Sequence, residues 1–342
     1  MNSDIPSIAQ SIEKNPLGRL MYGQRELFHS NLLAWFFDTL PEAADRVFSP
    51  MSDPGIGSEE RRVQRELGNL DLVMRWPGRR PLVLENKVFS IPTFRQLDEY
   101  AQKTSRWIEE PMKALLAPSK PPFELDGWAF VSYRDLASSI SESLSGPDTS
   151  YETETMRRYA SLASDLSELV GAVEVGSYEE LVWLPETLLD SVSSGQMLAA
   201  LQKARASRVA WLINKEVPGL NRPAGSGMTR AKPFVESFEA VEIDGIRVLL
   251  GWQLQGHDLR RSAIYQDESL RGRQVQEGIS REHPEFFTLP SSYSDTRAGR
   301  SEFNYFAPDS VYQYVKVKNL TIQELIAVAQ WIHDDLSKLG VG

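Results

Sequence analysis

The stretch Leu82-Val83-Leu84-Glu85-Asn86-Lys87-Val88 decides the fold, because an apolar run and charged side chains must share one strand. Nearly continuous apolar residues are typical of a strand covered on both faces, so residues 81–88 are predicted to form a central strand. Residues two apart on an extended chain point to the same face, which places Glu85 beside Lys87. The backbone carbonyl of Asn86 is expected to face the same region from the strand itself.

A second carboxylate lies on a neighbouring apolar segment. Residues 63–76 are predicted to form one strand that carries Asp71, and a Pro-Gly-Arg-Arg turn at 77–80 follows it. A carboxylate on an apolar strand is costly without a partner, and a bound cation is one way to stabilise it. If the turn makes a hairpin, Asp71 and Glu85 offer two hard oxygen donors to one divalent ion.

Helices and strands alternate through the rest of the first half. Apolar residues three and four apart predict a buried helix at 25–40. Periodicity and turn signals then predict a loop at 41–58, a helix at 93–113 followed by a Pro-rich loop, a strand at 127–133, a loop at 138–148 and helices at 152–170 and 178–191. The order around the two acids is therefore helix, strand, strand, helix, strand.

The sequence pattern changes in the second half of the chain. We therefore expect a domain at 1–190, followed by a C-terminal α+β region at 191–342 of unknown role. The elements expected there are a helix at 196–217, a linker at 221–233, a hairpin of 238–243 with 246–253 about Asp244-Gly245, a strand at 311–317 and a helix at 322–339. Basic residues occur at 222–232 and at Arg260, Arg261, Arg271 and Arg273. They would suit phosphate contacts, although interleaved acids favour a solvated surface.

Composition excludes several kinds of chemistry. The chain has no cysteine and four scattered histidines, which excludes disulfides, thiolate zinc sites, cysteine nucleophiles and paired-histidine zinc hydrolases. Its 37 basic and 47 acidic residues give a net charge of −10, which argues against broad coating of a polyanion but not against a local basic groove. A polar, acid-bearing start and the lack of a long apolar stretch predict a cytoplasmic protein with no membrane partner.

Three motifs together resemble a known family. Asp71 followed by Glu85-x-Lys87 resembles the catalytic signature of the PD-(D/E)XK nuclease superfamily, although the proline that often precedes the first acid is replaced here by Asn69-Leu70. Gln96-Leu-Asp-Glu-Tyr100 is similar to the Q-x-x-x-Y motif of its RecB-like branch. The segment that begins at Glu26 resembles the leading helix of a bacterial branch, which supplies a further acid to the site. The resemblance covers about the first 190 residues.

The resemblance implies an α/β, restriction-endonuclease-like core in which a mixed central sheet is flanked by helices. It implies that Mg²⁺ or Mn²⁺ is held by Glu26, Asp71, Glu85 and the carbonyl of Asn86, because hard oxygens suit a hard ion. Lys87 would orient the attacking water or stabilise the transition state. Gln96 would position groups at the site, and Tyr100 would stack or hydrogen-bond nearby. The catalytic residues expected are thus Glu26, Asp71, Glu85, Lys87, Gln96 and Tyr100.

The implied function is metal-dependent hydrolysis of phosphodiester bonds in nucleic acid, with DNA as the expected substrate, in a bacterial defence or repair setting. A homodimer or a partner in a defence complex stays open. The alternatives are a non-catalytic nuclease fold that serves as a binding or assembly module, and an RNA-directed nuclease. Glu85 and Lys87 alone could be an ordinary ion pair on a half-exposed strand, and His29 is expected to be a core histidine.

Overall fold

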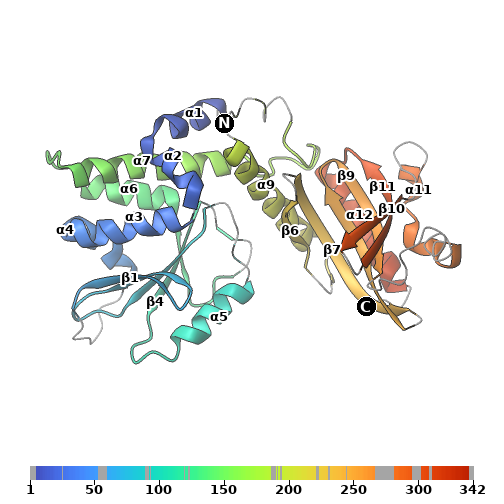
Figure 1. The fold of residues 1–342 in the computed structure, drawn as a ribbon, viewed down its shortest axis with the longest axis horizontal. Helices are drawn as coiled ribbons and strands as arrows, with labels where there is room; N and C mark the ends of the chain where they lie inside the picture. The colour runs from blue at the N-terminus through green and yellow to red at the C-terminus, as the bar shows by residue number, and fades with distance from the viewer. Residues whose placement is uncertain are drawn as a thin grey trace. The chain divides into compact units, whose positions relative to one another are not determined.

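The computed structural model describes residues 5–24, 26–52, 60–88, 92, 94–118, 120–121, 124–185, 190, 192, 195–220, 223–229, 232–243, 245–265, 281–294, 302–307 and 310–338. The side chains of residues 19, 22–24, 26, 94–95, 294, 302–307 and 310–312 are outside this description. The chain forms two compact units (Figure 1). The N-terminal unit comprises 1–173 and 190–201, and the C-terminal unit comprises 174–189 and 202–342.

The N-terminal unit is built on a mixed sheet of five strands. In spatial as in chain order these are β1 (Arg62–Leu67), β2 (Leu70–Arg75), β3 (Leu82–Asn86), β4 (Met112–Ala117) and β5 (Ala129–Ser132). The first three strands are antiparallel, and β3, β4 and β5 run parallel. Every residue of β3 is buried, which confirms the prediction of a central strand.

Helices lie on both sides of this sheet (Figure 1). They are α1 (Ile5–Lys14), α2 (Pro16–Gln24), α3 (Glu26–Thr39), α4 (Pro41–Phe48) with the short η1 (Ser49–Met51), α5 (Phe94–Thr104), α6 (Tyr133–Ser143) and α7 (Tyr151–Gly171). Leu97 and Tyr100 of α5 pack with Val83 on one face of the sheet. Helix α3 contacts β1, β2 and β3 on the other face. The helix predicted at 25–40 is confirmed as α3, and that at 152–170 as α7.

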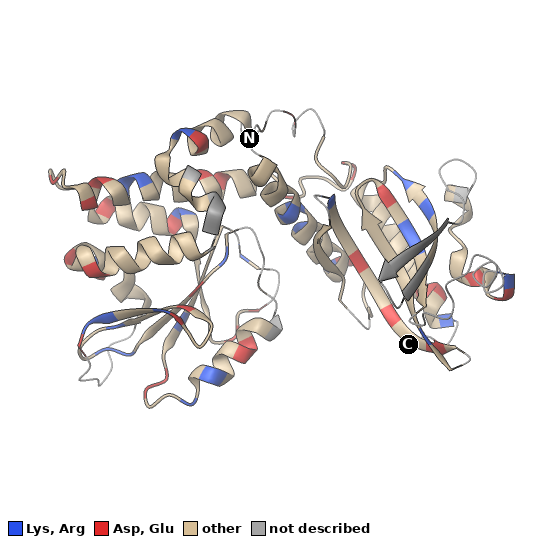
Figure 2. Cartoon of the chain, viewed as in Figure 1, with Lys and Arg blue, Asp and Glu red and all other residues tan. Residues whose placement is uncertain are grey.

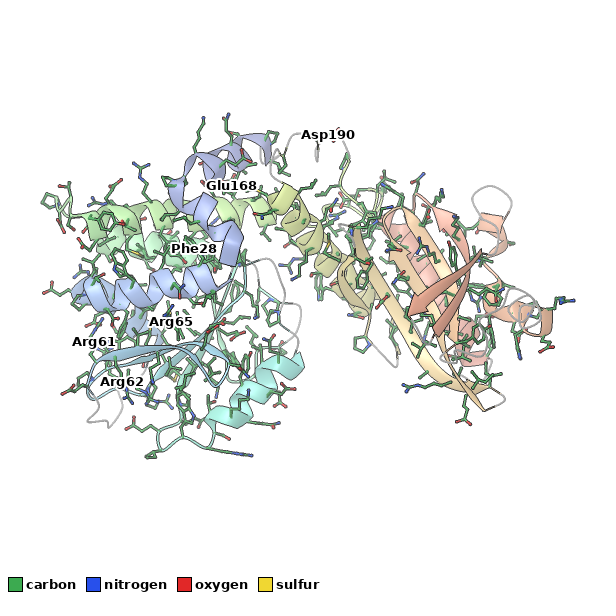
Figure 3. The ribbon with its side chains drawn as sticks, in the orientation of Figure 1. Phe28, Arg61, Arg62, Arg65, Glu168 and Asp190 are labelled. Carbon is green, nitrogen blue, oxygen red and sulfur yellow. The ribbon has the colours of Figure 1, made fainter. Side chains whose placement is uncertain are left out.

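An arginine next to the edge strand β1 contacts two helices, α3 and α4. Figure 3 labels Arg61, Arg62 and Arg65 along β1 and just before it. Arg61 forms an ion pair with Asp45 of α4, and its guanidinium lies 3.9 Å from the ring centroid of Phe37. Charged residues on an edge strand also oppose pairing with a second sheet.

The single strand predicted at 63–76 is wrong, because the structure folds it into the hairpin of β1 and β2. Gly68 and Asn69 form the turn with φ of +62° and +71°. Two consecutive residues with positive φ make the tight turn whose twist matches antiparallel strands. A glycine followed by an asparagine was the local signal for this turn.

The helix predicted at 93–113 is also wrong in its second half. Helix α5 ends at Thr104, and 112–117 is the strand β4. The Pro-rich loop predicted after that helix is wrong over 114–117, where the short apolar run Ala114 to Ala117 belongs to the strand. Parallel pairing with β3 makes this run a strand.

Two predicted loops contain helices instead. The segment 41–58 begins with α4, where Pro41 occupies the first turn and Ala44 and Phe48 are buried. The segment 138–148 begins inside α6, whose first turn is capped by Ser132 through a bond from the Asp135 N–H to Oγ. Conversely, the helix predicted at 178–191 is absent over 178–185 and at 190, the described residues of that segment.

The C-terminal unit is an antiparallel sheet of six strands packed against helices. The spatial order is β10 (Glu302–Ala307), β11 (Ser310–Lys318), β9 (Asp258–Tyr265), β8 (Ile246–Gln255), β7 (Lys232–Ile243) and β6 (Gly225–Thr229). Buried residues of α12 (Ile322–Lys338) and of α9 (Gly195–Glu216) share one core with this sheet. Two short helices, η3 (Pro284–Phe287) and α11 (Ser291–Ser294), complete the described part.

Sequence predictions for this unit had mixed outcomes. The hairpin about Asp244-Gly245 is confirmed by the pairing of Ile243 with Ile246, as are the strand at 311–317 and the helices at 196–217 and 322–339. The linker predicted at 221–233 is wrong over 225–229, which forms β6, and at 232–233, where β7 begins. Arg261 is not a surface cation, because it is 1% exposed. Arg222, Arg230, Arg271 and Arg273 lie outside the described residues.

No helix in the described part of the chain combines the length and the apolar character needed to cross a membrane.

Candidate metal centre and active site

The candidate site forms where strands β2 and β3 separate. Their pairing ends at Leu72 and Leu84, and the next residue on each strand is a carboxylate, Asp71 or Glu85. Strand β3 still pairs with β4 beyond this point, since the Lys87 N–H donates to the carbonyl of Leu116 at 2.8 Å. Backbone pairing along β3 therefore ends at Leu84 on the β2 side but continues to Lys87 on the β4 side. Beyond Leu84, side chains can occupy the β2 side.

The carboxylate of Asp71 replaces a backbone acceptor on that side. The Asn86 N–H donates to Asp71 Oδ2 at 2.8 Å. This bond satisfies a backbone donor of the central strand and also fixes the carboxylate beside Glu85 and Asn86. The N–H and C=O of one strand residue point to the same side, so the Asn86 carbonyl is directed to the side of Asp71 as well.

Glu85 and Lys87 form a buried ion pair on one face of the sheet. Lys87 Nζ lies 2.8 Å from Glu85 Oε1, and the side chains are 12% and 1% exposed. The strand is therefore not half-exposed, and an ion pair this deep is costly to desolvate without further hydrogen bonds.

Helix α5 supplies one of those hydrogen bonds. Gln96 Nε2 donates to Glu85 Oε1 at 3.3 Å and to the Tyr100 hydroxyl at 3.1 Å. The two residues are four apart on the helix and so point to the same side. Gln96 thus connects the strand carboxylate to the phenol.

The charges of the site act on Tyr100. Burial raises the pKa of this tyrosine above its ordinary value, and the bond from Gln96 opposes that rise. The negative charges of Glu85 and Asp71 also raise the pKa, whereas Lys87 lowers it. Tyr100 is therefore a protonated phenol at neutral pH and can donate a hydrogen bond.

The structure brings five of the six expected catalytic residues together: Asp71, Glu85, Lys87, Gln96 and Tyr100. Glu26 is the first residue of α3, and its side chain lies outside the described part. Its expected role as a ligand stays a prediction.

The donor set fits a hard divalent ion. Two carboxylates and the carbonyl of Asn86 converge at one strand end, and Mg²⁺ is commonly held by one or two carboxylates together with water and substrate phosphate. Among the described residues there is no group of three or more Asp, Glu and His that could enclose an ion. The ligands this site offers would leave coordination positions for water or a phosphate.

Sequence reasoning missed the hydrogen-bond partners of the Asn86 side chain. The Asn86 side chain is fully buried, and its Oδ1 accepts a hydrogen bond from the hydroxyl of Tyr133 on α6. Its Nδ2 donates to Ser30 Oγ on α3 at 3.4 Å. Alternation places this side chain on the face opposite Glu85, but nothing local identifies a partner 47 residues away.

His29 is a core residue next to this network. It is fully buried, and burial lowers its pKa from 6.5 to about 3, so the ring is neutral at physiological pH. Its Nδ1 lies 3.1 Å from the hydroxyl of Tyr159. The expectation of a core histidine is confirmed.

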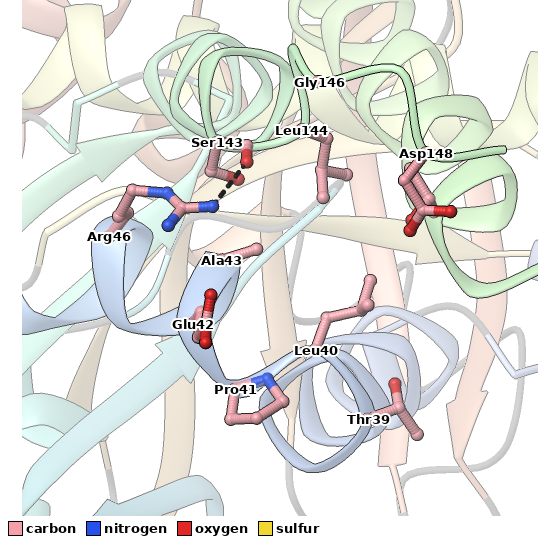
Figure 4. A pocket seen from close by; sticks show the side chains of 11 residues that line it. Thr39, Leu40, Pro41, Glu42, Ala43, Arg46, Ser143, Leu144, Gly146 and Asp148 are labelled. Carbon is pink, nitrogen blue, oxygen red and sulfur yellow. Dashed lines mark hydrogen bonds between the residues drawn. The ribbon is translucent and has the colours of Figure 1, made fainter. Parts of the chain in front are cut away.

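A separate cavity of about 390 Å³ lies at the other end of α3 (Figure 4). It is bordered by residues 39–43 and by the start of α7, and Arg46 on its rim donates to the carbonyl of Ser143 at 2.8 Å. None of its lining residues belongs to the acidic strand end. The candidate site is therefore identified by its chemistry and not by its concavity.

Comparison of the chain with protein-family models, with curated proteins and with solved structures gives no match.

Proposed function

We propose that the N-terminal unit is a metal-dependent nuclease that hydrolyses phosphodiester bonds in DNA, in a bacterial defence or repair setting. The observation that carries the proposal is the bond from the Asn86 N–H to Asp71, which holds two strand carboxylates next to one lysine. The arrangement of α3, three antiparallel strands, α5 and a parallel strand supports the restriction-endonuclease-like core that the sequence motifs imply.

Each residue of the site has a role in this proposal. Asp71, Glu85 and the Asn86 carbonyl hold Mg²⁺ or Mn²⁺, which when bound supplies an acidified water and neutralises charge on the phosphate. Lys87 places a positive charge beside the reacting phosphate, where it is most useful in the transition state. Gln96 fixes the orientation of the Glu85 carboxylate, and the protonated Tyr100 donates to a phosphate or water oxygen.

The second candidate is a non-catalytic binding or assembly module. It is favoured by the contact of Lys87 with Glu85, because the lysine together with Gln96 already compensates that buried carboxylate. An RNA-directed nuclease uses the same residues as the DNA enzyme, and only the substrate separates these two activities.

The test is incubation of the full chain with supercoiled plasmid, linear duplex DNA and single-stranded RNA, in Mg²⁺, Mn²⁺ or EDTA. Asp71→Asn removes the charge and keeps an oxygen for the Asn86 N–H, so it should fold and fail to cut. Asp98→Asn is the matched control, because Asp98 is exposed on α5 and bonds Gln102. Cleavage that persists in EDTA or in Asp71→Asn contradicts the proposal, and ion binding without cleavage of any substrate favours the module.

A further inference from the structure

Asn86 is held from two directions, toward β2 in the plane of the sheet and toward the helices on one face of it. Its N–H is bound to Asp71 on the β2 side, and its side chain is bound to Tyr133 and Ser30 within the helical layer. Glu85 and Lys87 flank it in sequence and point to the other face of the sheet, toward α5. Both the backbone N–H and the side chain of Asn86 are therefore fixed by hydrogen bonds.

The hydroxyl of Tyr133 is itself held in a rigid aromatic group. Its ring meets the His29 ring edge-on, with the centroids 5.3 Å apart, and His29 in turn packs on Tyr159 at 5.6 Å. All three side chains are completely buried. Close-packed rings allow little rotation, so this group is suited to fix the position of one hydroxyl.

Two hydroxyl groups of this layer bind the two ends of the Asn86 side-chain amide. The Asn86 amide offers one oxygen and one NH₂ group, and these are bound by the Tyr133 hydroxyl from α6 and the Ser30 hydroxyl from α3 respectively. A hydrophobic residue at position 86 would suit a buried strand better, unless the amide serves to fix the backbone.

We propose that Tyr133 is a positioning residue that, through the Asn86 side chain, keeps the Asn86 N–H on Asp71 and its carbonyl directed at the divalent ion. This inference rests on the proposed metal site. Groups that orient metal ligands without touching the ion usually change metal affinity by about 10- to 100-fold when removed. The Tyr133 hydroxyl acts only through the Asn86 side chain, so we expect a change near the lower end of that range.

The experiment compares Tyr133→Phe with Tyr159→Phe in the full chain. Both variants delete one hydroxyl from a completely buried tyrosine of the same helical layer, but only the hydroxyl of Tyr133 contacts Asn86. Two quantities are measured: the Kd for Mn²⁺ by titration calorimetry, and amide hydrogen exchange of residues 85–87 in metal-free protein. Tyr133→Phe should weaken Mn²⁺ binding by about tenfold and speed exchange at Asn86, whereas Tyr159→Phe should lose similar thermal stability and change neither.

Parental Mn²⁺ affinity and parental exchange in Tyr133→Phe would overturn the inference and leave Tyr133 a packing residue. If Tyr133→Phe does not fold, Ser30→Ala replaces it, with a smaller effect expected in the same direction because its bond is longer. A parent that binds Mn²⁺ but cuts no nucleic acid would refute the proposed function, and the positioning role would still be decided by affinity and exchange. A parent that binds no ion would refute the metal site, and equal exchange in the two variants would then refute the positioning as well.

Discussion

The two units bury charged side chains in opposite ways, although Lys, Arg, Asp and Glu are interleaved along both (Figure 2). Among the described residues of the C-terminal unit, the buried charged side chains are Arg205, Arg208 and Arg261, and each meets a carboxylate. At the strand end of the N-terminal unit the buried Glu85 meets Lys87, and Asp71 accepts the N–H of Asn86 beside them. Carboxylates that gather at a strand end can hold a cation, whereas an arginine bonded to a carboxylate is a structural contact.

Two arginines of the C-terminal unit show how such a side chain is held, by a carboxylate and by backbone carbonyls together. Arg205 is 2% exposed and donates to Glu180 at 2.7 Å and to the carbonyls of Glu174 and Val182, each at 2.9 Å. Arg261 pairs with Asp335 and also donates to the carbonyl of Thr288. Such arginines are held by a carboxylate and by backbone carbonyls, which is the pattern of a structural contact.

The largest expected effect is on the rate of cleavage. It should appear when an acid of the N-terminal unit is changed and not when an acid of the C-terminal unit is changed. Glu85→Gln should reduce Mg²⁺-dependent cleavage by about 10³-fold or more, because a metal ligand and several kcal/mol of transition-state stabilisation are lost. Asp335→Asn should cut at the parental rate. Single-turnover cleavage at saturating Mg²⁺ measures both, and equal losses in the two variants would remove the distinction between the units.

The next effect concerns stability in the C-terminal unit. Asp335→Asn leaves the buried Arg261 without its carboxylate and should lower the free energy of unfolding by about 3 kcal/mol. Arg261→Met removes the buried charge itself and should cost less, because Asp335 is 27% exposed and can be hydrated. Denaturant unfolding followed by hydrogen exchange on peptides of this unit gives both values. A larger loss in Arg261→Met would contradict this order.

A smaller effect is expected for the lysine of the active strand. Lys87→Ala should cut about 10²-fold more slowly, the usual loss for one electrostatic stabiliser of a transition state. It should bind Mn²⁺ at least as well as the parent, because an ammonium beside the site repels the ion. Single-turnover rates with Mn²⁺ calorimetry on the same variant decide this. Parental cleavage would make Lys87 an ion-pair partner of Glu85 and nothing more.

The effect that is smallest near neutral pH is a dependence of stability on pH in the N-terminal unit. The folded pKa of His29 is lowered from 6.5 to about 3, so below pH 6.5 the unfolded chain binds a proton that the folded chain does not. Stability is full above pH 6.5 and falls by about 1.4 kcal/mol per pH unit as the pH drops toward 3. The parent should show this slope relative to His29→Phe in denaturant unfolding between pH 4 and 7. Parallel curves for the two proteins would mean that His29 titrates normally.

Sequence reasoning found most of the candidate site because its signals are local. Glu85 and Lys87 share a face through strand alternation, and Gln96 and Tyr100 share one through helical periodicity. The pairing of Asp71 with this strand needed only the turn at 77–80. Glu26 stayed an expectation throughout, because the structure does not describe its side chain.

Errors in the fold arose where a segment suits two local structures. The prolines around β4 suit a loop, but its apolar run forms a strand because β3 is there to pair with it. The segment 41–58 looks like a loop because of the turn signal at 50–57, yet Val47 and Phe48 become buried and make 41–48 a helix. These choices depend on contacts with other parts of the chain.

The sequence by itself determined the charged end of the central strand, the long amphipathic helices and the Asp244-Gly245 hairpin, because periodicity and turn chemistry act over a few residues. Only the tertiary structure decided that β2 and β3 separate at Asp71 and that Tyr133 and Ser30 bind the Asn86 side chain. These contacts join residues 15, 47 and 56 positions apart. Such contacts exist only after the sheet and helices have packed, and no local pattern specifies them.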